Sequence, residues 1–302
     1  MSLSIFLGLV EVVLREGFIY GIMAMGVYIT YKILDFPDLS VDGTFPLGAC
    51  IAASLITIGF NPWLVCLVAF AAGACAGSVT GLLHVKLGIT DLLSGILVMT
   101  AMWSVNLIIT GGSAIKQFFN MNTIFNSGIV NILPQSLYDH RQIIMVFLIA
   151  IVVKYGLDWY LSTKNGLLLR ASGDNSQYVT NLARNPGSMK ILGLALGNGC
   201  TALAGCILAQ LNQNADINSG KGMVVMALAS VIIGISVFKR LSFVRFVTMA
   251  VLGAIIYKAS LMVALQLGLP SSYLKLLMAI LLTLAIVSEK LKIKGGGKLA
   301  KQ

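Results

Sequence analysis

Charged side chains inside long apolar stretches are the residues of this chain with the greatest chemical potential, because burying a charge in a membrane is costly. The residues concerned are Asp91, Lys154, Asp158, Lys258 and Lys275. Lys154 and Asp158 are four positions apart, so on a helix they share one face and are predicted to pair. Lys258 and Lys275 fall deeper, where a lysine can snorkel, line a cavity or pair with a carboxylate from another segment. A proton-coupled carrier would use such residues as its relay.

Catalytic and metal-binding patterns were not found in the sequence. It contains no G-x-x-x-x-G-K-[ST] phosphate-binding loop, so no ATP site is predicted on this chain. His84 and His140 fall in different predicted loops, so we expect no shared metal site and two solvated side chains. The five cysteines lack C-x-x-C spacing and are predicted to be small packing residues. They are Cys50, Cys66, Cys75, Cys200 and Cys206. We expect neither an enzyme nor a directly bound cofactor.

A basic polar segment between two apolar stretches is the strongest motif of the chain. It reads Gly166-x-x-x-Arg170-Ala171-x-Gly173-Asp174-Asn175 and continues to Ala183-Arg184-Asn185-Pro186-Gly187. Asp174 and Asn175 favour a helix start, and Asn185-Pro186-Gly187 favours a stop, so a short surface helix between two turns is predicted. Such a helix could dock into a cleft of a motor subunit and transmit rigid-body motion. The alternative is an ordinary basic loop.

A second polar element carries three carboxylates and a proline between two apolar windows. It reads Asp35-Phe36-Pro37-Asp38-Leu39-Ser40-Val41-Asp42-Gly43-Thr44. The element is either a short cytoplasmic loop or a break in a helix inside the membrane, and the residues alone leave both open. Asn198 and Thr201, in a later apolar stretch, are also polar enough to face a pathway.

The composition requires that most of the chain face lipid or other parts of itself. Of 302 residues, 58% are hydrophobic and 11% are charged, and the mean hydropathy is +0.92. A helix needs about 20 apolar residues to cross a bilayer. Windows of suitable length predict spans at 17–34, 44–59, 62–83, 91–112, 142–162, 190–211, 222–238, 246–268 and 272–288. Residues 1–16 are predicted to form an interfacial helix, or a further span if they insert.

We therefore predict an all-α, polytopic bundle of about 8 to 10 membrane spans in a single domain, 1–302. If the spans alternate, most Lys and Arg residues fall on the side of the basic tail, 289–302, and positive charge marks the cytoplasmic side. The net charge of +10 thus reflects membrane orientation, and no nucleic-acid partner is expected. Gly193, Gly197 and Gly205 predict close helix packing around the span 190–211.

Three elements resemble the permeases of ATP-binding-cassette (ABC) importers of the branched-chain amino-acid and ribose type. The segment Gly166-x-x-x-Arg170-Ala171-x-Gly173-x-Asn175 is similar to the coupling helix of that family. The element 38–43 is similar to its D-L-S-V-G motif, which interrupts a helix beside the translocation path. Ala227-x-Ala229-Ser230-Val231-Ile232-Ile233-Gly234 resembles its A-A-V-x-x-G-G stretch. Asp42 stands where the sugar permeases have glycine, which weakens a sugar assignment. The likeness covers about 11–288.

The resemblance implies a bacterial cytoplasmic-membrane importer with a broken helix near 35–43, a coupling helix near 166–187 and a cytoplasmic C-terminus. Its implied partners are a separate ATPase carrying ATP and Mg, an extracytoplasmic binding protein or lipoprotein, a second copy of the chain and the bilayer. Alternating access would move a small amino acid, with aromatic ones favoured. The alternatives are a sugar or nucleoside permease, an ion-gradient-driven transporter and, last, a scaffold or enzyme subunit.

The resemblance also assigns roles to residues. Coupling to the ATPase is expected of Gly166, Arg170, Ala171, Gly173, Asp174, Asn175, Ala183 and Gly187. The substrate pathway is expected to include Asp38, Ser40, Asp42, Thr44, Asn198 and Thr201.

Overall fold

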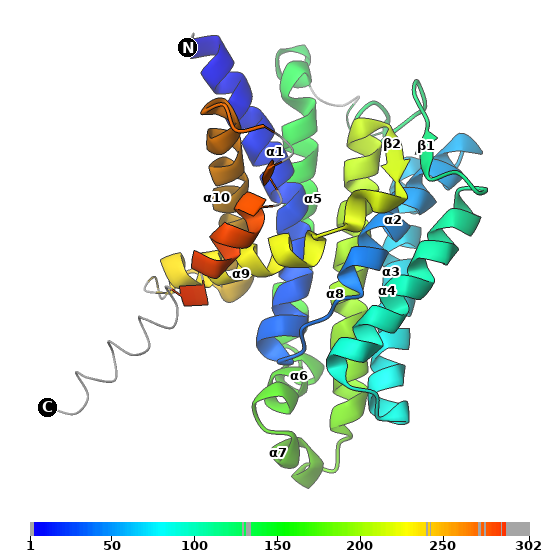
Figure 1. Cartoon of the computed structure of the whole chain (residues 1–302), viewed down its shortest axis with the longest axis vertical. Helices are drawn as coiled ribbons and strands as arrows, with labels where there is room; N and C mark the ends of the chain where they lie inside the picture. Colours follow the sequence, from blue (N-terminus) through cyan, green and yellow to red (C-terminus); the bar gives the residue numbers. More distant parts are fainter. Residues whose placement is uncertain are drawn as a thin grey trace, which may run out of the picture.

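The computed structural model describes residues 3–128, 130, 134–239, 241, 243–270, 273–274, 276–284 and 286–287. Helices make up most of this part of the chain, and most of them run along the long axis of the molecule (Figure 1). Among the described residues, seven helical segments are long and apolar enough to cross a membrane, and a further apolar helix, Val41–Thr57, is shorter. The predicted all-α polytopic bundle is confirmed.

The elements follow one another with few long connections. In chain order they are α1 (Leu3–Val27), the π-helix η1 (Tyr28–Ile33), α2 (Val41–Thr57), α3 (Pro62–Leu87), α4 (Asp91–Ile109), β1 (Ile115–Gln117), the 3-10 helix η3 (Gln135–His140), α5 (Arg141–Ser162), α6 (Lys164–Asp174), α7 (Ser176–Asn181), α8 (Pro186–Asn212), β2 (Asn214–Asp216), the 3-10 helix η4 (Ile217–Gly220), α9 (Met223–Phe238) and α10 (Phe246–Gln266). The two strands pair antiparallel, with Lys116 opposite Ala215, and the sequence analysis did not predict them.

The start and the end of the chain differ from the prediction. Residues 3–16 are not a separate helix, because α1 runs without interruption from Leu3 to Val27 and continues into η1. An interfacial position for 1–16 stays a prediction. The last predicted span, 272–288, is described only in part, and Lys275 and the tail 289–302 lie outside the described residues.

Helix α8 lies at the centre of the bundle and packs against α1, α2 and α3. Its small residues allow this approach. A Cβ atom added at Gly205 would lie 1.9 Å from the carbonyl oxygen of Phe45 in α2, and one added at Gly48 would lie 1.8 Å from that of Ala202. Both distances are far below van der Waals contact, so the two backbones touch directly at these glycines. The predicted close packing of this helix is confirmed.

The break predicted near 35–43 is present. Helix η1 ends at Ile33, Asp35 has a positive φ of 52°, and regular structure resumes only at Val41. The connecting segment turns back into the bundle, so α2 begins about halfway along the molecule rather than at its end (Figure 1). The first turn of α2 and the residues before it are therefore placed beside the middle of α8.

The predicted surface helix is a pair of helices, α6 and α7. The stretch expected as a turn, 166–174, is itself helical, because the Thr163 hydroxyl caps α6 by accepting from Gly166 N. Asn175 caps α7 in the same way, as the sequence predicted. Asn185 accepts from Gly187 N and so starts α8, where only a stop was expected. We call the end of the molecule that carries α6 and α7 the α6 end.

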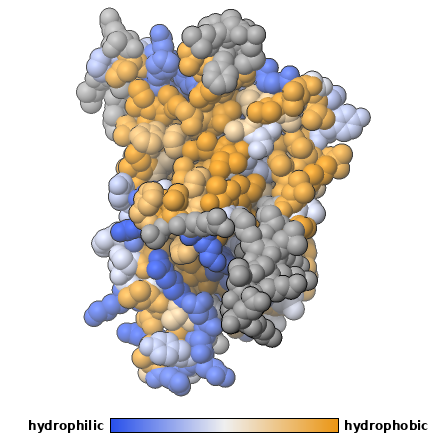
Figure 2. All heavy atoms as spheres, turned by 90° about the vertical axis from the view of Figure 1, so that its left-hand side faces the viewer, coloured by the Kyte–Doolittle hydropathy of each residue, from blue (hydrophilic) through white to orange (hydrophobic). Residues whose placement is uncertain are grey.

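The surface matches a protein that sits in a bilayer. Apolar residues cover a broad band over the middle and upper parts of the face in Figure 2, and hydrophilic residues gather at the α6 end. Helices α3, α4 and α5 expose large apolar side chains along their length, such as Leu67, Trp103 and Val152. Water would not stabilise such a surface, whereas lipid or a second protein would.

Candidate functional site

A buried polar cluster joins the broken segment to α8. The Asp38 carboxylate accepts a hydrogen bond from Ser40 N (2.8 Å) and another from the Asn198 side-chain amide (2.7 Å). The amide oxygen of Asn198 in turn accepts from the hydroxyls of Ser40 (3.1 Å) and Thr44 (2.7 Å). Four residues predicted for the pathway, from two distant parts of the chain, are thus in contact.

The cluster fixes the geometry of the break. Ser40, Thr44 and Asn198 are fully buried and Asp38 is 4% exposed. A carboxylate in such a place needs several donors, and here a backbone N–H and a side-chain amide supply them. All four side chains are buried in this conformation, and their part in the pathway stays a prediction.

Asp42 and Thr201 lie apart from this cluster. The two carboxylate oxygens of Asp42 accept from Gly222 N (2.9 Å) and Val224 N (2.8 Å), at the start of α9. Asp42 therefore caps a second helix that begins inside the molecule, and its negative charge stabilises the helix dipole there. The Thr201 hydroxyl donates to the Gly197 carbonyl within α8 (2.9 Å). Pathway roles for both residues stay predictions.

The α6 segment packs directly on the structure that leads to the break. A Cβ atom at Gly173 would lie 1.7 Å from the carbonyl oxygen of Ile33, the last residue of η1. A Cβ at Gly166 would lie 2.3 Å from the carbonyl oxygen of Tyr160 in α5. Two glycines of the predicted coupling motif are thus required for contact with two membrane helices. Arg170, between them, is exposed and available to another protein.

The other predicted coupling residues have different surroundings. Ala171 lies on α6, Ala183 follows α7 with a φ of 54°, and Gly187 lies against Val85 at the end of α3. Gly187 therefore allows α8 to begin close to α3. Their coupling roles stay predictions.

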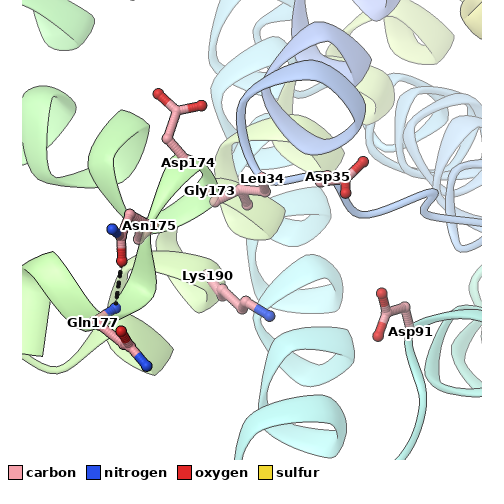
Figure 3. A pocket seen from close by; sticks show the side chains of 9 residues that line it. Leu34, Asp35, Asp91, Gly173, Asp174, Asn175, Gln177 and Lys190 are labelled. Carbon is pink, nitrogen blue, oxygen red and sulfur yellow. Dashed lines mark hydrogen bonds between the residues drawn. The ribbon is translucent and has the colours of Figure 1, made fainter.

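A hollow of about 500 Å³ opens beside the α6 segment. Figure 3 shows Asp174 and Asn175 on one side, Asp35 and Asp91 on the other, and Lys190 projecting between them. The lining carries both signs of charge, as expected for a surface that contacts water or another protein. The lining includes Gln177 at the start of α7 and Asp35 in the broken segment, so the hollow lies between these two elements.

The two histidines lie far apart along the chain, and neither forms a group with enough ligands for a metal ion among the described residues. His140 is largely exposed and lies 3.1 Å from Glu11. The expectation of a solvated His84 is wrong, because this residue belongs to α3 and its side chain is 17% exposed. Its Nε2 is 3.2 Å from the Lys190 ammonium, which can only donate, so Nδ1 carries the ring proton and donates to Ile89 O (2.9 Å).

Among the described residues, three of the charges predicted inside spans form ion pairs, namely Lys154, Asp158 and Lys258. Asp158 lies 3.2 Å from Lys154, as predicted, and 3.4 Å from Arg245. Lys258 lies 2.6 Å from Glu16, a partner that the sequence analysis placed before the first span. The continuous α1 brings Glu16 beside α10, which explains the difference.

We expect the Lys258–Glu16 pair to be structural. Lys258→Met should cost about 1–2 kcal/mol of stability, because it leaves the partly buried Glu16 carboxylate unpaired. Adding Glu16→Gln should cost less than the sum of the two single changes. The coupling is measured from the thermal unfolding midpoints, in detergent, of the unchanged protein, the two single variants and the double variant. A proton relay would behave differently: Lys258→Met would then stop transport and leave the midpoint unchanged.

The long apolar helices, the helix broken inside the bundle and the polar cluster beside it define a multi-pass membrane protein of the transporter class. The chain belongs to the family described as branched-chain amino acid transport system / permease component, which matches residues 9–286. Its membership of this family and its long apolar helices together identify the chain as a multi-pass inner-membrane protein.

Three relatives match most of the chain. A tyrosine transport system permease protein of Clostridioides difficile is 42% identical over 93% of this chain and 91% of its own length. An uncharacterised protein of Rickettsia prowazekii is 31% identical over 92% of this chain and 96% of its own length. The ribose import permease protein of Haemophilus influenzae is 26% identical over 74% of this chain and 67% of its own length. No solved structure matches the chain significantly.

Proposed function

We propose that this chain is the membrane-spanning subunit of an ABC importer and moves a small amino acid, with aromatic ones favoured, by alternating access. ATP and Mg would bind a separate ATPase, and this chain would catalyse no covalent step. The substrate preference is supported by the likeness to a tyrosine transport permease at 42% identity. A sugar or nucleoside is the second candidate, supported by the more distant ribose permease.

The observation that carries the proposal is the contact of Gly173 with Ile33. We expect α6 and η1 to move together, because their backbones touch at this glycine. Ser40 lies seven residues after the end of η1, and its hydroxyl donates a hydrogen bond to Asn198 in the centre of the bundle. A push on α6 would therefore reach the broken segment through a short, packed path. The exposed Arg170 and the neighbouring hollow would receive the ATPase, and the α6 end would then lie in the cytoplasm.

The remaining partners follow from this arrangement. An extracytoplasmic binding protein or lipoprotein would deliver the solute to the opposite end, which carries β1 and β2 (Figure 1). A second copy would cover part of the exposed apolar surface of the chain, and two copies would bind two ATPase subunits.

Arg170→Glu combined with Gly173→Leu should reduce uptake at least tenfold, because one change reverses the charge offered to the ATPase and the other separates α6 from η1. Uptake and ATP hydrolysis are measured on the complete importer in proteoliposomes. Gly156→Leu is the matched control, since a Cβ there meets nothing within 4 Å. Assembly and uptake that survive the double substitution would show that the coupling assignment is wrong. Uptake into ATP-free vesicles driven by an ion gradient would establish the secondary-transporter alternative.

A further inference from the structure

A second hollow, of about 460 Å³, lies between α5, α6 and the first turn of α10, and we call it the arginine hollow. Two arginines line it, Arg170 from α6 and Arg245 from the position just before α10. Asp158 is the acidic residue among the described residues of its lining, and Lys154 neutralises that carboxylate over 3.2 Å. The hollow therefore carries a net positive charge.

The charged groups of the arginine hollow lie close together. The Arg245 guanidinium is 3.4 Å from the Asp158 carboxylate, and the charges of Arg170 and Asp158 both act on the Tyr28 hydroxyl, which belongs to the same lining. The Asp158 side chain is 5% exposed, whereas that of Arg245 is 67% exposed. The buried carboxylate thus holds Arg245 in place, and the guanidinium stays accessible to a ligand. No side chain among the described residues caps α10, so the N–H groups of its first turn can add to the donors.

Apolar and aromatic side chains surround the arginine hollow. Leu167 and Phe246 line it and are both exposed, and the neighbouring Phe243 is 82% exposed. Trp159, which follows Asp158 on α5, is 71% exposed. Aromatic residues are enriched where a membrane protein crosses the lipid headgroups. In Figure 1, α10 lies entirely above α6 and α7, so the hollow lies at the border between the polar α6 end and the apolar part of the molecule.

A ligand that fits these surroundings has an anionic head and hydrocarbon chains. Guanidinium groups form strong, often bidentate, hydrogen bonds to phosphate oxygens. Basic hollows between helices at the headgroup level bind anionic lipids. A small water-soluble anion would gain nothing from the apolar rim, and an acidic protein surface would have to cover aromatic side chains that lipid already suits.

We infer that the arginine hollow binds the phosphate group of an anionic phospholipid, with Arg245 and Arg170 as its cationic contacts. The acyl chains would lie against the exposed apolar residues of α5 and α10. A guanidinium carries five N–H donors, so Arg170 can contact a phosphate and still face the ATPase. This inference adds a lipid site beside the coupling segment and depends on neither the proposed substrate nor the proposed motor.

Native mass spectrometry of the full chain in detergent tests the inference, with phosphatidylglycerol and phosphatidylcholine as the probes. Both lipids contain a phosphate, but only phosphatidylglycerol has a net negative charge. The first phosphatidylglycerol should bind at least about fivefold more tightly than the first phosphatidylcholine, because two cations face its head. Arg245→Gln should remove most of this preference, since it keeps a polar side chain but no charge. Lys154 still neutralises Asp158 in this variant, so the fold should be retained.

Arg184→Gln is the matched control, because Arg184 is an exposed arginine at the same end that does not line the arginine hollow. It should keep the preference of the unchanged protein for phosphatidylglycerol. Arg245→Lys keeps the charge but loses the planar fork of donors, so it should retain part of the preference. It also serves as the second variant if Arg245→Gln does not fold.

Equal binding of the two lipids, or an unchanged preference in Arg245→Gln, would overturn the inference. Displacement of phosphatidylglycerol by excess inorganic phosphate would also overturn it, because the site would then be one for free phosphate. Displacement by the added ATPase would do the same, because the hollow would then be a docking site for acidic residues of that protein. The lipid measurements involve neither transport nor ATP hydrolysis, so their failure would leave the importer assignment intact.

Discussion

Gly48→Ala is expected to prevent the accumulation of folded protein, although it adds only one methyl group. The added Cβ would lie 1.8 Å from the carbonyl oxygen of Ala202, an atom of the α8 backbone. A side chain could rotate away, but a helix carbonyl is held by its own hydrogen bond and cannot. Overpacking a core usually costs 1–3 kcal/mol, and a backbone clash at the central helix should cost at least about 3 kcal/mol.

The measurement is the yield of monodisperse protein in detergent and its thermal unfolding midpoint. Gly156→Ala is the matched control, because it makes the same change at an exposed helix position where a Cβ meets nothing within 4 Å. Its helix propensity should rise, so its stability should stay equal or increase by up to about 1 kcal/mol. If the two variants behave alike, α2 and α8 are not packed at Gly48 as described.

The fold was largely predictable because the lipid bilayer restricts which sequences can form a membrane-spanning segment. A span needs a long apolar helix, and composition alone exposes most such helices in this chain. Two features escaped this rule. The start of α1 was predicted wrongly because Glu11, Arg15 and Glu16 lie in the first 14 residues of this helix, and charged residues there resemble a segment outside the membrane. Pairing of β1 with β2 joins segments far apart in the chain, which no local pattern reports.

The candidate site was predictable in part, for a similar reason. Asn198 is conspicuous because a polar residue in an apolar helix is costly without partners, and its partners proved to be Asp38, Ser40 and Thr44. The same signal is present at Asn106, within the apolar span 91–112, whose buried side-chain amide donates to the Gly43 carbonyl in α2. The capping of α9 by Asp42 could not be predicted, because it depends on how two interior helix starts meet.

Asn198→Leu is expected to destabilise the protein by about 3 kcal/mol and to reduce uptake strongly. The leucine would leave the buried Asp38 carboxylate without its side-chain donor, and the Ser40 and Thr44 hydroxyls without their shared acceptor. Each buried polar group without a partner costs about 1–3 kcal/mol, and a charged one costs more. Thermal unfolding in detergent measures the first effect, and uptake at equal expression measures the second.

Asn198→Asp tests the polarity of this cluster with almost no change in volume. It places a second carboxylate where the amide donated to Asp38 over 2.7 Å, so it should also be strongly destabilising. Adding Asp38→Asn restores one donor between the two side chains, now directed from position 38 to position 198. The double variant should therefore regain at least half of the lost stability, although the new carboxylate still faces the Leu194 carbonyl, 3.1 Å from the original amide nitrogen. Additive losses would mean that the two residues are not directly bonded, because independent sites add and contacting ones do not.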